Sequence, residues 1–244
     1  MFNFISMSSS STFSNEMLEK ENKLIVSQSI INNKLKKIVK EIIDIYKKED
    51  NKKEIVLICL LKGGVYFCID LSRELEKYNI KHTIEFLRIS SYNNDQTNAK
   101  NEIIQYVGNK EDLKKKLNNK LIFFVDELLD TGKTILNAFN WMYSETQIKI
   151  NYIVVMFFKL KDNLFFTLNK KDDINLKNNN ELIMGIYVPD LWLIGYGLDD
   201  SDTLRGLIDV YAIEKTTKEL KNEDDLIFTN KKKYNLMLEI IENQ

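Results

Sequence analysis

Short runs of consecutive apolar residues, each long enough for one buried strand, recur along the middle of the chain. The clearest are Ile55–Leu61, Leu121–Val125 and Tyr152–Phe158. Strands that are buried on both faces have this unbroken apolar pattern, which is typical of parallel sheets covered by helices. Apolar residues at helical spacing precede the first run, at Leu35–Tyr46, and follow the second, at Ile135–Met142. This alternation predicts an α/β fold with a mostly parallel central sheet flanked by helices.

Further segments of strand length lie on both sides of these runs. They are Thr83–Ile89, Ile103–Val107, Leu182–Tyr187, Leu191–Tyr196 and Leu207–Ile213. Each is short, rich in apolar or aromatic residues and bounded by polar segments, as strands are. A helix pattern that includes Leu71, Leu75 and Tyr78 follows the first apolar run. We therefore expect these segments to add strands to a single α/β domain.

The domain is predicted to occupy residues 21–215. Residues 1–20 have neither the basic segment nor the unbroken apolar stretch of a signal peptide, and we expect a disordered tail there. Residues 161–180 are rich in Lys, Asn and Asp, which predicts a surface insertion. Residues 216–244 form a highly charged extension, with one helix expected near Lys233–Ile241.

Composition excludes several classes of protein. With Lys+Arg 35 and Asp+Glu 36, the chain lacks the basic excess of most nucleic-acid-binding domains. Its apolar stretches are shorter than the roughly 20 residues that cross a bilayer, so no membrane association is expected. Cys59 and Cys68 lie in apolar segments without metal-ligand spacing, which favours buried thiols and a cytoplasmic protein. His82, the only histidine, lies in a strand pattern and is predicted to be structural.

The segment after Leu121–Val125 carries polar residues whose chemistry suits a phosphorylated sugar. It reads DELLDTGKT, from Asp126 to Thr134, and a helix pattern follows it. In an open parallel sheet, ligands bind beyond the carboxyl ends of the strands, which is where we expect this loop. Its threonine hydroxyls, a glycine that permits close backbone approach and the free amides of a helix N-terminus can together bind a phosphate group.

The acidic residues of this segment favour a ribose phosphate over a nucleoside triphosphate. Gly132-Lys133-Thr134 matches the end of a P-loop, but that motif needs a glycine where Glu127 stands, and the neighbouring carboxylates would repel a triphosphate. Paired carboxylates such as Asp126 and Glu127 instead accept hydrogen bonds from vicinal ribose hydroxyls. Capping of the next helix would explain any one of these acids, including Asp130, but explains the whole segment less well.

Four separated motifs together resemble those of the type I phosphoribosyltransferases, and among these the hypoxanthine-guanine phosphoribosyltransferases. The motifs are LLKGG at Leu60–Gly64, RISSYNND at Arg88–Asp95, VDELLDTGKT at Val125–Thr134 and VPDLWLIGYGLDDSDTLRGL at Val188–Leu207. The resemblance spans about Leu24 to Ile213 and implies the fold of that family, with a small base-binding hood and a flexible lid loop. It also implies a purine salvage enzyme that uses Mg²⁺ to transfer 5-phosphoribosyl from phosphoribosyl pyrophosphate to hypoxanthine or guanine, giving IMP or GMP and pyrophosphate.

The resemblance also implies a role for each matching residue. Those expected to bind the phosphoribosyl group are Asp126, Glu127, Asp130, Thr131, Gly132, Lys133 and Thr134. Those expected at the pyrophosphate are Lys62, Gly63 and Arg205, with a cis peptide bond at Leu61–Lys62. Those expected at the base are Lys159, Trp192, Leu193 and Asp199, and those expected at Mg²⁺ are Asp199, Asp126 and Glu127. Asp130 is the expected catalytic acid/base, and Ser91 and Tyr92 belong to the expected lid, which extends to about Glu102.

Each of these residues also has an ordinary structural explanation, such as a solvated charge, a strand-to-helix turn or a tryptophan in the core. The chain departs from the family pattern in the order of Asp126 and Glu127, which is usually Glu then Asp, and in the segment after Lys159, where Lys161 is an alternative base ligand. Activity on another base, such as xanthine or uracil, and a non-catalytic phosphoribosyl-binding regulator therefore remain alternatives. The family also implies a homodimer or homotetramer.

Overall fold

The structure is a computed structural model that describes residues 22–49, 53–93, 100–159 and 181–213. The predicted N-terminal tail, the surface insertion, the charged C-terminal extension and the tip of the expected lid lie outside these residues. In the described part of the chain, no helix is long and apolar enough to cross a membrane.

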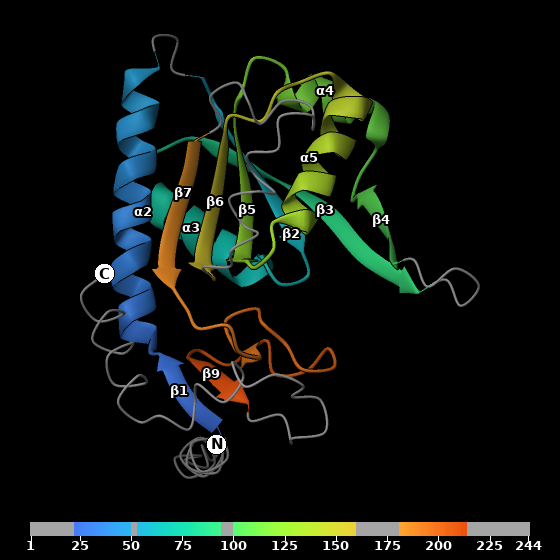
Figure 1. Cartoon of the computed structure of the whole chain (residues 1–244). Coiled ribbons are helices and arrows are strands. Elements are labelled where there is room, and N and C mark those ends of the chain that lie inside the picture. The colour runs from blue at the N-terminus through green and yellow to red at the C-terminus, as the bar shows by residue number, and fades with distance from the viewer. Residues whose placement is uncertain (1–21, 50–52, 94–99, 160–180, 214–244) are drawn as a thin grey trace, which may run out of the picture.

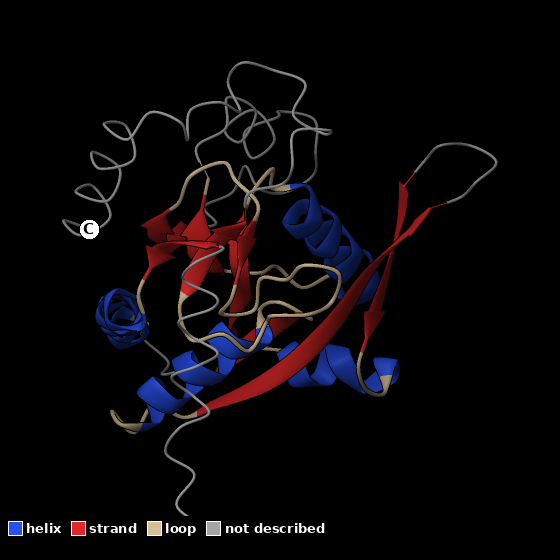
Figure 2. Ribbon diagram, turned by 90° about the horizontal axis from the view of Figure 1, so that it is seen from below, coloured by secondary structure: helices blue, strands red, loops and turns tan. Residues whose placement is uncertain are grey.

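A six-stranded sheet forms the centre of the fold, in the order β4-β3-β2-β5-β6-β7. Its strands are β2 (Ile55–Leu61), β3 (His82–Asn93), β4 (Lys100–Tyr106), β5 (Leu121–Leu129), β6 (Tyr152–Phe158) and β7 (Glu181–Tyr187). All neighbouring pairs are parallel except β3 and β4, which are antiparallel. In Figure 2 these two form a long ribbon that extends past the rest of the sheet. The predicted mostly parallel α/β sheet is confirmed.

Helices cover both faces of this sheet (Figure 1). The helices α2 (Gln28–Lys48) and α3 (Val65–Glu76) lie on one face, and α4 (Lys110–Leu117) and α5 (Lys133–Thr146) lie on the other. Alternate residues of β2 enter the two cores, with Ile55, Leu57 and Cys59 on the α2–α3 side and Val56, Ile58 and Leu60 on the α5 side. Because neither face meets water, every position along the strand is apolar.

A small second sheet lies beyond the carboxyl ends of the central strands, and we call it the hood (Figure 1). Its order is β1-β9-β8, with β1 (Asn22–Val26), β8 (Leu193–Ile194) and β9 (Val210–Ile213) paired antiparallel. The strand predicted at Leu191–Tyr196 is wrong in length, because the chain turns into left-handed backbone at Gly195, Tyr196 and Gly197, with φ of 93°, 49° and 102°. The hood is thus built from both ends of the domain.

The polar segment after the central strand begins later than predicted. β5 continues through Asp126 and Glu127 to Leu129, pairing with β6 as far as Phe158, so only Asp130–Gly132 remains between β5 and α5. The acids at the end of β5 are therefore strand residues and not loop residues.

Candidate active site

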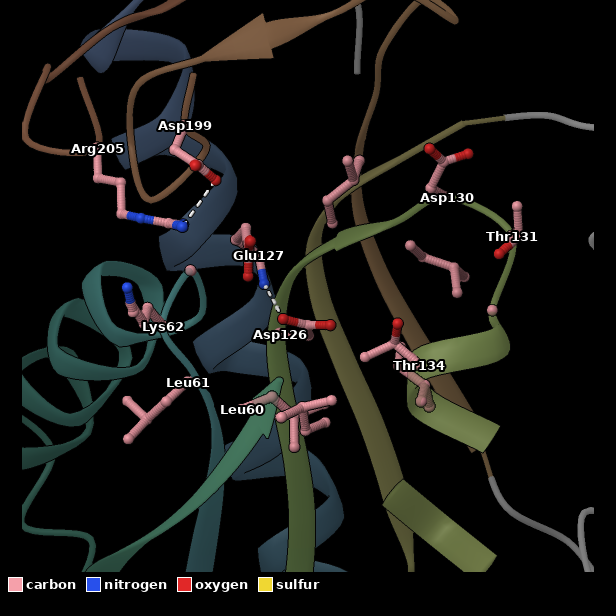
Figure 3. Close-up of a pocket in the computed structure, with 16 residues that line it drawn as sticks. Leu60, Leu61, Lys62, Asp126, Glu127, Asp130, Thr131, Thr134, Asp199 and Arg205 are labelled. Carbon is pink, nitrogen blue, oxygen red and sulfur yellow. Dashed lines mark hydrogen bonds and ion pairs between the residues drawn. The ribbon is translucent and has the colours of Figure 1, made fainter. Parts of the chain in front are cut away.

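A pocket opens where the carboxyl ends of β2 and β5 face the hood (Figure 3). Four segments line it: the end of β2 and its turn into α3, the end of β5 with the start of α5, the chain between β8 and β9, and β3 at Ile89. The lining residues with polar or charged side chains are Lys62, Asp126, Glu127, Asp130, Thr131, Thr134, Asp199 and Arg205. Such a set can bind a ligand that carries both hydroxyl groups and negative charge.

The start of α5 forms one wall of the pocket. Gly132, at φ 77°, is the N-cap of α5, and this left-handed conformation favours glycine. The Thr131 hydroxyl accepts a hydrogen bond from the amide of Lys133 at 3.4 Å, and the Thr131 and Thr134 side chains line the cavity. Since the first amides of a helix have no acceptor within the helix, this wall is suited to a phosphate group.

Two adjacent carboxylates, Asp126 and Glu127, form the floor. Asp126 is only 9% exposed, and its Oδ1 accepts the amide N–H of Glu127 at 3.0 Å. Burial raises the pKa of Asp126 well above its usual range, and the nearby charge of Glu127 raises it further. Glu127 Oε2 is buried and has no hydrogen-bond partner among the described residues. An orphaned buried carboxylate oxygen is suited to a hydroxyl donor or a metal ion.

The Glu127 carboxylate also lies directly over the backbone of Gly63. A Cβ atom on Gly63 would be 1.7 Å from Glu127 Oε1, so a side chain fits there only if Glu127 moves. The neighbouring Leu61–Lys62 peptide bond is cis, as the resemblance implied. The turn after β2 and the end of β5 are therefore in close contact.

The cationic side chains of Arg205 and Lys62 form the opposite wall, close to acidic residues of the chain between β8 and β9. Arg205 Nη2 lies 2.7 Å from Asp199 Oδ1 and 3.1 Å from Asp202 Oδ1, and Arg205 Nη1 donates to the carbonyl of Gly197 at 2.7 Å. Lys62 Nζ lies 2.8 Å from Asp202 Oδ2. Two cations at one end of the pocket are suited to a strongly anionic group.

A buried lysine lies next to the pocket. Lys159 is 7% exposed and comes directly after β6. Its Nζ donates to the carbonyl of Leu191 at 2.9 Å and lies 3.4 Å from Asp130 Oδ2 and 3.3 Å from Asp190 Oδ1. Lys159 therefore connects the end of β5 with the chain that enters the hood.

Comparison with known proteins identifies the family. Residues 27–180, more than half of the chain, match the family model of the phosphoribosyl transferase domain. The chain belongs to the phosphoribosyltransferase family. It is 31% identical over 199 residues to the hypoxanthine-guanine phosphoribosyltransferase of Aquifex aeolicus, covering 82% of this chain and 98% of that protein. It is 28% identical to the hypoxanthine phosphoribosyltransferase of Buchnera aphidicola, covering 76% of this chain and 92% of the relative.

Solved structures agree with this family at the level of the fold. The hypoxanthine phosphoribosyltransferase of Trypanosoma cruzi, solved with the product IMP, superposes with a TM-score of 0.59 at 22% identity, covering 80% of this chain and 95% of that one. The fold of this chain, a mostly parallel sheet with helices on both faces and a hood beyond its carboxyl edge, is the type I phosphoribosyltransferase fold.

Most residues that the resemblance assigned lie together in this phosphoribosyltransferase. The pocket contains the acids of β5, the Asp130–Gly132 turn, Thr134, Lys62, Gly63, Asp199 and Arg205. Lys133 is exposed and does not line it. Lys159 lies behind Asp130, Leu193 is buried in the hood, and Trp192, in the same segment, is 47% exposed and does not line the pocket. Ser91 and Tyr92 lie in β3, beyond the pocket residue Ile89, and pair with Glu102 and Asn101 of β4.

The structure adds residues that the sequence did not single out. Asp202 contacts both pocket cations, and Asp190 contacts Lys159. Asp202 lies 140 positions from Lys62 along the chain, so spacing in the sequence could not predict their contact. The only available signal was its position in the GLDDSDTLRGL motif, three residues before Arg205.

Proposed function

We propose that this phosphoribosyltransferase is a purine salvage enzyme, which transfers 5-phosphoribosyl from phosphoribosyl pyrophosphate to hypoxanthine or guanine. The products are IMP or GMP and pyrophosphate. The observation that carries the proposal is one pocket with a phosphate-binding helix start, a pair of carboxylates and a pair of cations arranged around it. The relatives named for hypoxanthine and guanine, at 31% identity and below, support this choice of base.

Each wall of the pocket suits one part of phosphoribosyl pyrophosphate. The amides and hydroxyls of Thr131, Gly132 and Thr134 bind the 5′-phosphate, and Lys133 adds positive charge from outside the pocket. Asp126 and Glu127 accept the ribose hydroxyls. On the other side, Lys62, the turn at Gly63 and Arg205 bind the pyrophosphate.

The reaction breaks the bond between C1′ and the pyrophosphate oxygen and forms a bond between C1′ and N9 of the purine. Positive charge develops on the ribose ring as the pyrophosphate leaves, so carboxylates near the ribose and cations near the leaving group lower the barrier. Asp130 accepts the proton that N7 of the purine loses as N9 attacks. Lys159, which lies beside Asp130, donates a hydrogen bond to the 6-oxo group. The electron pair of the broken bond remains on the pyrophosphate.

The pocket also fits the Mg²⁺ that this family implies. Glu127 Oε2 is an orphaned buried carboxylate oxygen, and Asp199 presents a second acid at the pyrophosphate side. Mg²⁺ prefers oxygen ligands and is commonly bound by one or two carboxylates together with substrate phosphates, so a complete protein cage is not required. Asp199, Asp126 and Glu127 are the acids that would hold the ion together with substrate oxygens, since no three acidic, histidine or cysteine side chains of the described residues are grouped closely enough to hold a metal by themselves. A bound Mg²⁺ would neutralise charge on the pyrophosphate.

In this proposal the base binds on the hood side of the pocket, near Lys159. Trp192 provides an exposed aromatic ring for stacking on the purine, and Leu193 provides backbone groups for its edge. Ser91 and Tyr92 belong to the lid that closes over the substrates, because exclusion of water protects the charged transition state. The two buried free thiols, Cys59 and Cys68, support a cytoplasmic location, and the family supports a homodimer or homotetramer.

A panel of bases tests the proposal directly. The purified protein is incubated with phosphoribosyl pyrophosphate, Mg²⁺ and each of hypoxanthine, guanine, xanthine and uracil, and nucleotides are separated by chromatography. We expect IMP and GMP, each with one equivalent of pyrophosphate. Product from xanthine or uracil alone would assign another base, and binding of phosphoribosyl pyrophosphate without any turnover would indicate a regulator.

A further inference from the structure

The carboxylate of Asp202 lies between the two cations of the pyrophosphate side. Its Oδ2 is 2.8 Å from Lys62 Nζ, and its Oδ1 is 3.1 Å from Arg205 Nη2. Each oxygen of the carboxylate therefore contacts a different cation, from a different segment of the chain. A phosphate group that binds both cations would bring its oxygens to the same two nitrogen atoms.

A tight turn presents this carboxylate to the cations. Asp200 and Thr203 exchange backbone hydrogen bonds of 3.2 and 2.9 Å, and the two residues between them, Ser201 and Asp202, have φ of 50° and 64°. The amide of Asp202 also donates to Asp199 Oδ2 at 2.8 Å. Non-glycine residues rarely adopt this left-handed conformation, so the surrounding contacts determine where Asp202 points.

The ion pair between Asp202 and Lys62 is exposed to solvent, so another anion can replace the Asp202 carboxylate. Arg205 is less exposed and has contacts besides the one to Asp202. The side chains of Asp202 and Lys62 are 64% and 57% exposed, and exposed ion pairs are weak. Arg205 is 20% exposed and is also bonded to Asp199 and to the carbonyl of Gly197. Loss of the Asp202 charge would therefore leave Arg205 in position and make Lys62 available to another anion.

We propose that Asp202 is an internal counter-ion of the pyrophosphate site, which the pyrophosphate group displaces on binding and which favours its release. This rests on the proposed function in one respect, that Lys62 and Arg205 bind the pyrophosphate. Pyrophosphate competes with the Asp202 carboxylate for Lys62 and Arg205. It displaces the carboxylate because it has a larger negative charge and more oxygen atoms to share between the two cations. The competition lowers its affinity, and a product that leaves faster inhibits the enzyme less.

The test compares Asp202→Asn with the matched control Asp200→Asn. Both variants remove one negative charge from the same turn, but the Asp200 side chain makes no hydrogen bond or ion pair with the described residues. Pyrophosphate is titrated into each protein with Mg²⁺ by calorimetry, and its inhibition constant is measured in the forward reaction. For Asp202→Asn we expect pyrophosphate binding that is about two- to fivefold tighter, the range that weak exposed ion pairs give, with product inhibition stronger by the same factor.

The direction of the effect separates a counter-ion from a structural residue. If Asp202 only held Lys62 and Arg205 in place, Asp202→Asn would bind pyrophosphate more weakly, which would overturn the proposal. Equal affinities for the two variants, or no pyrophosphate binding by any of the proteins, would overturn it as well. Asp202→Glu keeps the charge and is expected to retain affinity close to that of the unaltered protein.

This test is independent of the choice of base. If the unaltered protein binds pyrophosphate but makes no nucleotide, and Asp202→Asn binds more tightly than Asp200→Asn, the counter-ion is supported and the proposed function fails. If IMP and GMP are formed while both variants bind pyrophosphate equally, the proposed function is supported and the counter-ion fails.

Discussion

The proposed sugar-phosphate half of the site and its proposed base half are built in different ways. One continuous segment, from Asp126 to Thr134, supplies the carboxylates, the turn and the helix start of the first half. The base half brings together Lys159 after β6, Asp190 and Leu191 before the hood, and Trp192 at its edge. The first half therefore depends on one stretch of chain, whereas the second depends on contacts among several stretches. We therefore expect the first half to govern catalysis and the second to govern the choice of base.

The largest effect is expected where the two halves meet, at Asp130. Asp130→Asn keeps the size of the side chain but removes its ability to accept a proton, and general acid–base catalysis contributes about 10²–10⁴-fold. We expect kcat to fall by this factor for both hypoxanthine and guanine, with little change in KM for phosphoribosyl pyrophosphate. Steady-state kinetics at saturating substrates measures this, and a variant with unchanged kcat would remove Asp130 from the chemistry.

The base half is tested by Lys159→Gln. This variant loses the charged donor and leaves Asp130 and Asp190 without their shared partner. A hydrogen bond to a charged group contributes about 1.5–3 kcal/mol, so we expect KM for hypoxanthine to rise by about 10- to 100-fold. KM for phosphoribosyl pyrophosphate should change much less. An equal rise in both KM values would contradict the division between the halves.

The contact between the chain that connects β8 to β9 and the turn after β2 is tested at Gly197. A Cβ atom there would lie 2.2 Å from the carbonyl oxygen of Gly63, and φ is 102°, so Gly197→Ala is strained in two ways. We expect a loss of about 1–3 kcal/mol in the free energy of unfolding, measured with urea. Gly206→Ala is the matched control, because its Cβ would meet only the Tyr66 hydroxyl, at 3.6 Å. Equal losses in both variants would contradict this account.

The smallest effect is expected at Glu54, just before β2 and far from both halves. Hydrogen bonds from Lys120 and Lys81 lower the pKa of Glu54 from 4.5 to about 2. Since the pKa is lowered in the folded protein, the stabilisation is present above pH 4.5 and is lost as the pH falls from 4.5 towards 2. Glu54→Gln should therefore lower the urea midpoint at neutral pH, by an amount that shrinks in this acid range, without changing the kinetics. Identical pH profiles would exclude this role.

Much of the fold could be predicted from the sequence because its strands and helices have a clear pattern of burial. β6 matches the predicted Tyr152–Phe158, and β2 matches Ile55–Leu61. The helix α4 was not predicted, because only Leu113 and Leu117 of its charged sequence are buried, although Asn109 accepts the Glu111 amide as an N-cap should. The strand β1 was missed because its partner β9 lies at the other end of the domain.

The site could be predicted where its residues are neighbours in the chain. The sequence predicts a loop from Asp126 onward, because acidic residues seldom occupy a buried strand end, whereas β5 continues to Leu129. The Asp202 contacts depend on the left-handed turn and on Lys62, which lies in the turn between β2 and α3, and no local pattern specifies either. Sequence motifs thus located the site, and three-dimensional contact was needed to find its internal ion pairs.

The close approach of Glu127 to Gly63 has a consequence for how this site can change. With the longer acid at position 127, its carboxylate fills the space that any side chain at position 63 would need. An aspartate there would withdraw that carboxylate by one methylene and reopen the space. A side chain at position 63 is therefore compatible with Glu127 only if the Glu127 carboxylate leaves its present place on the floor of the pocket.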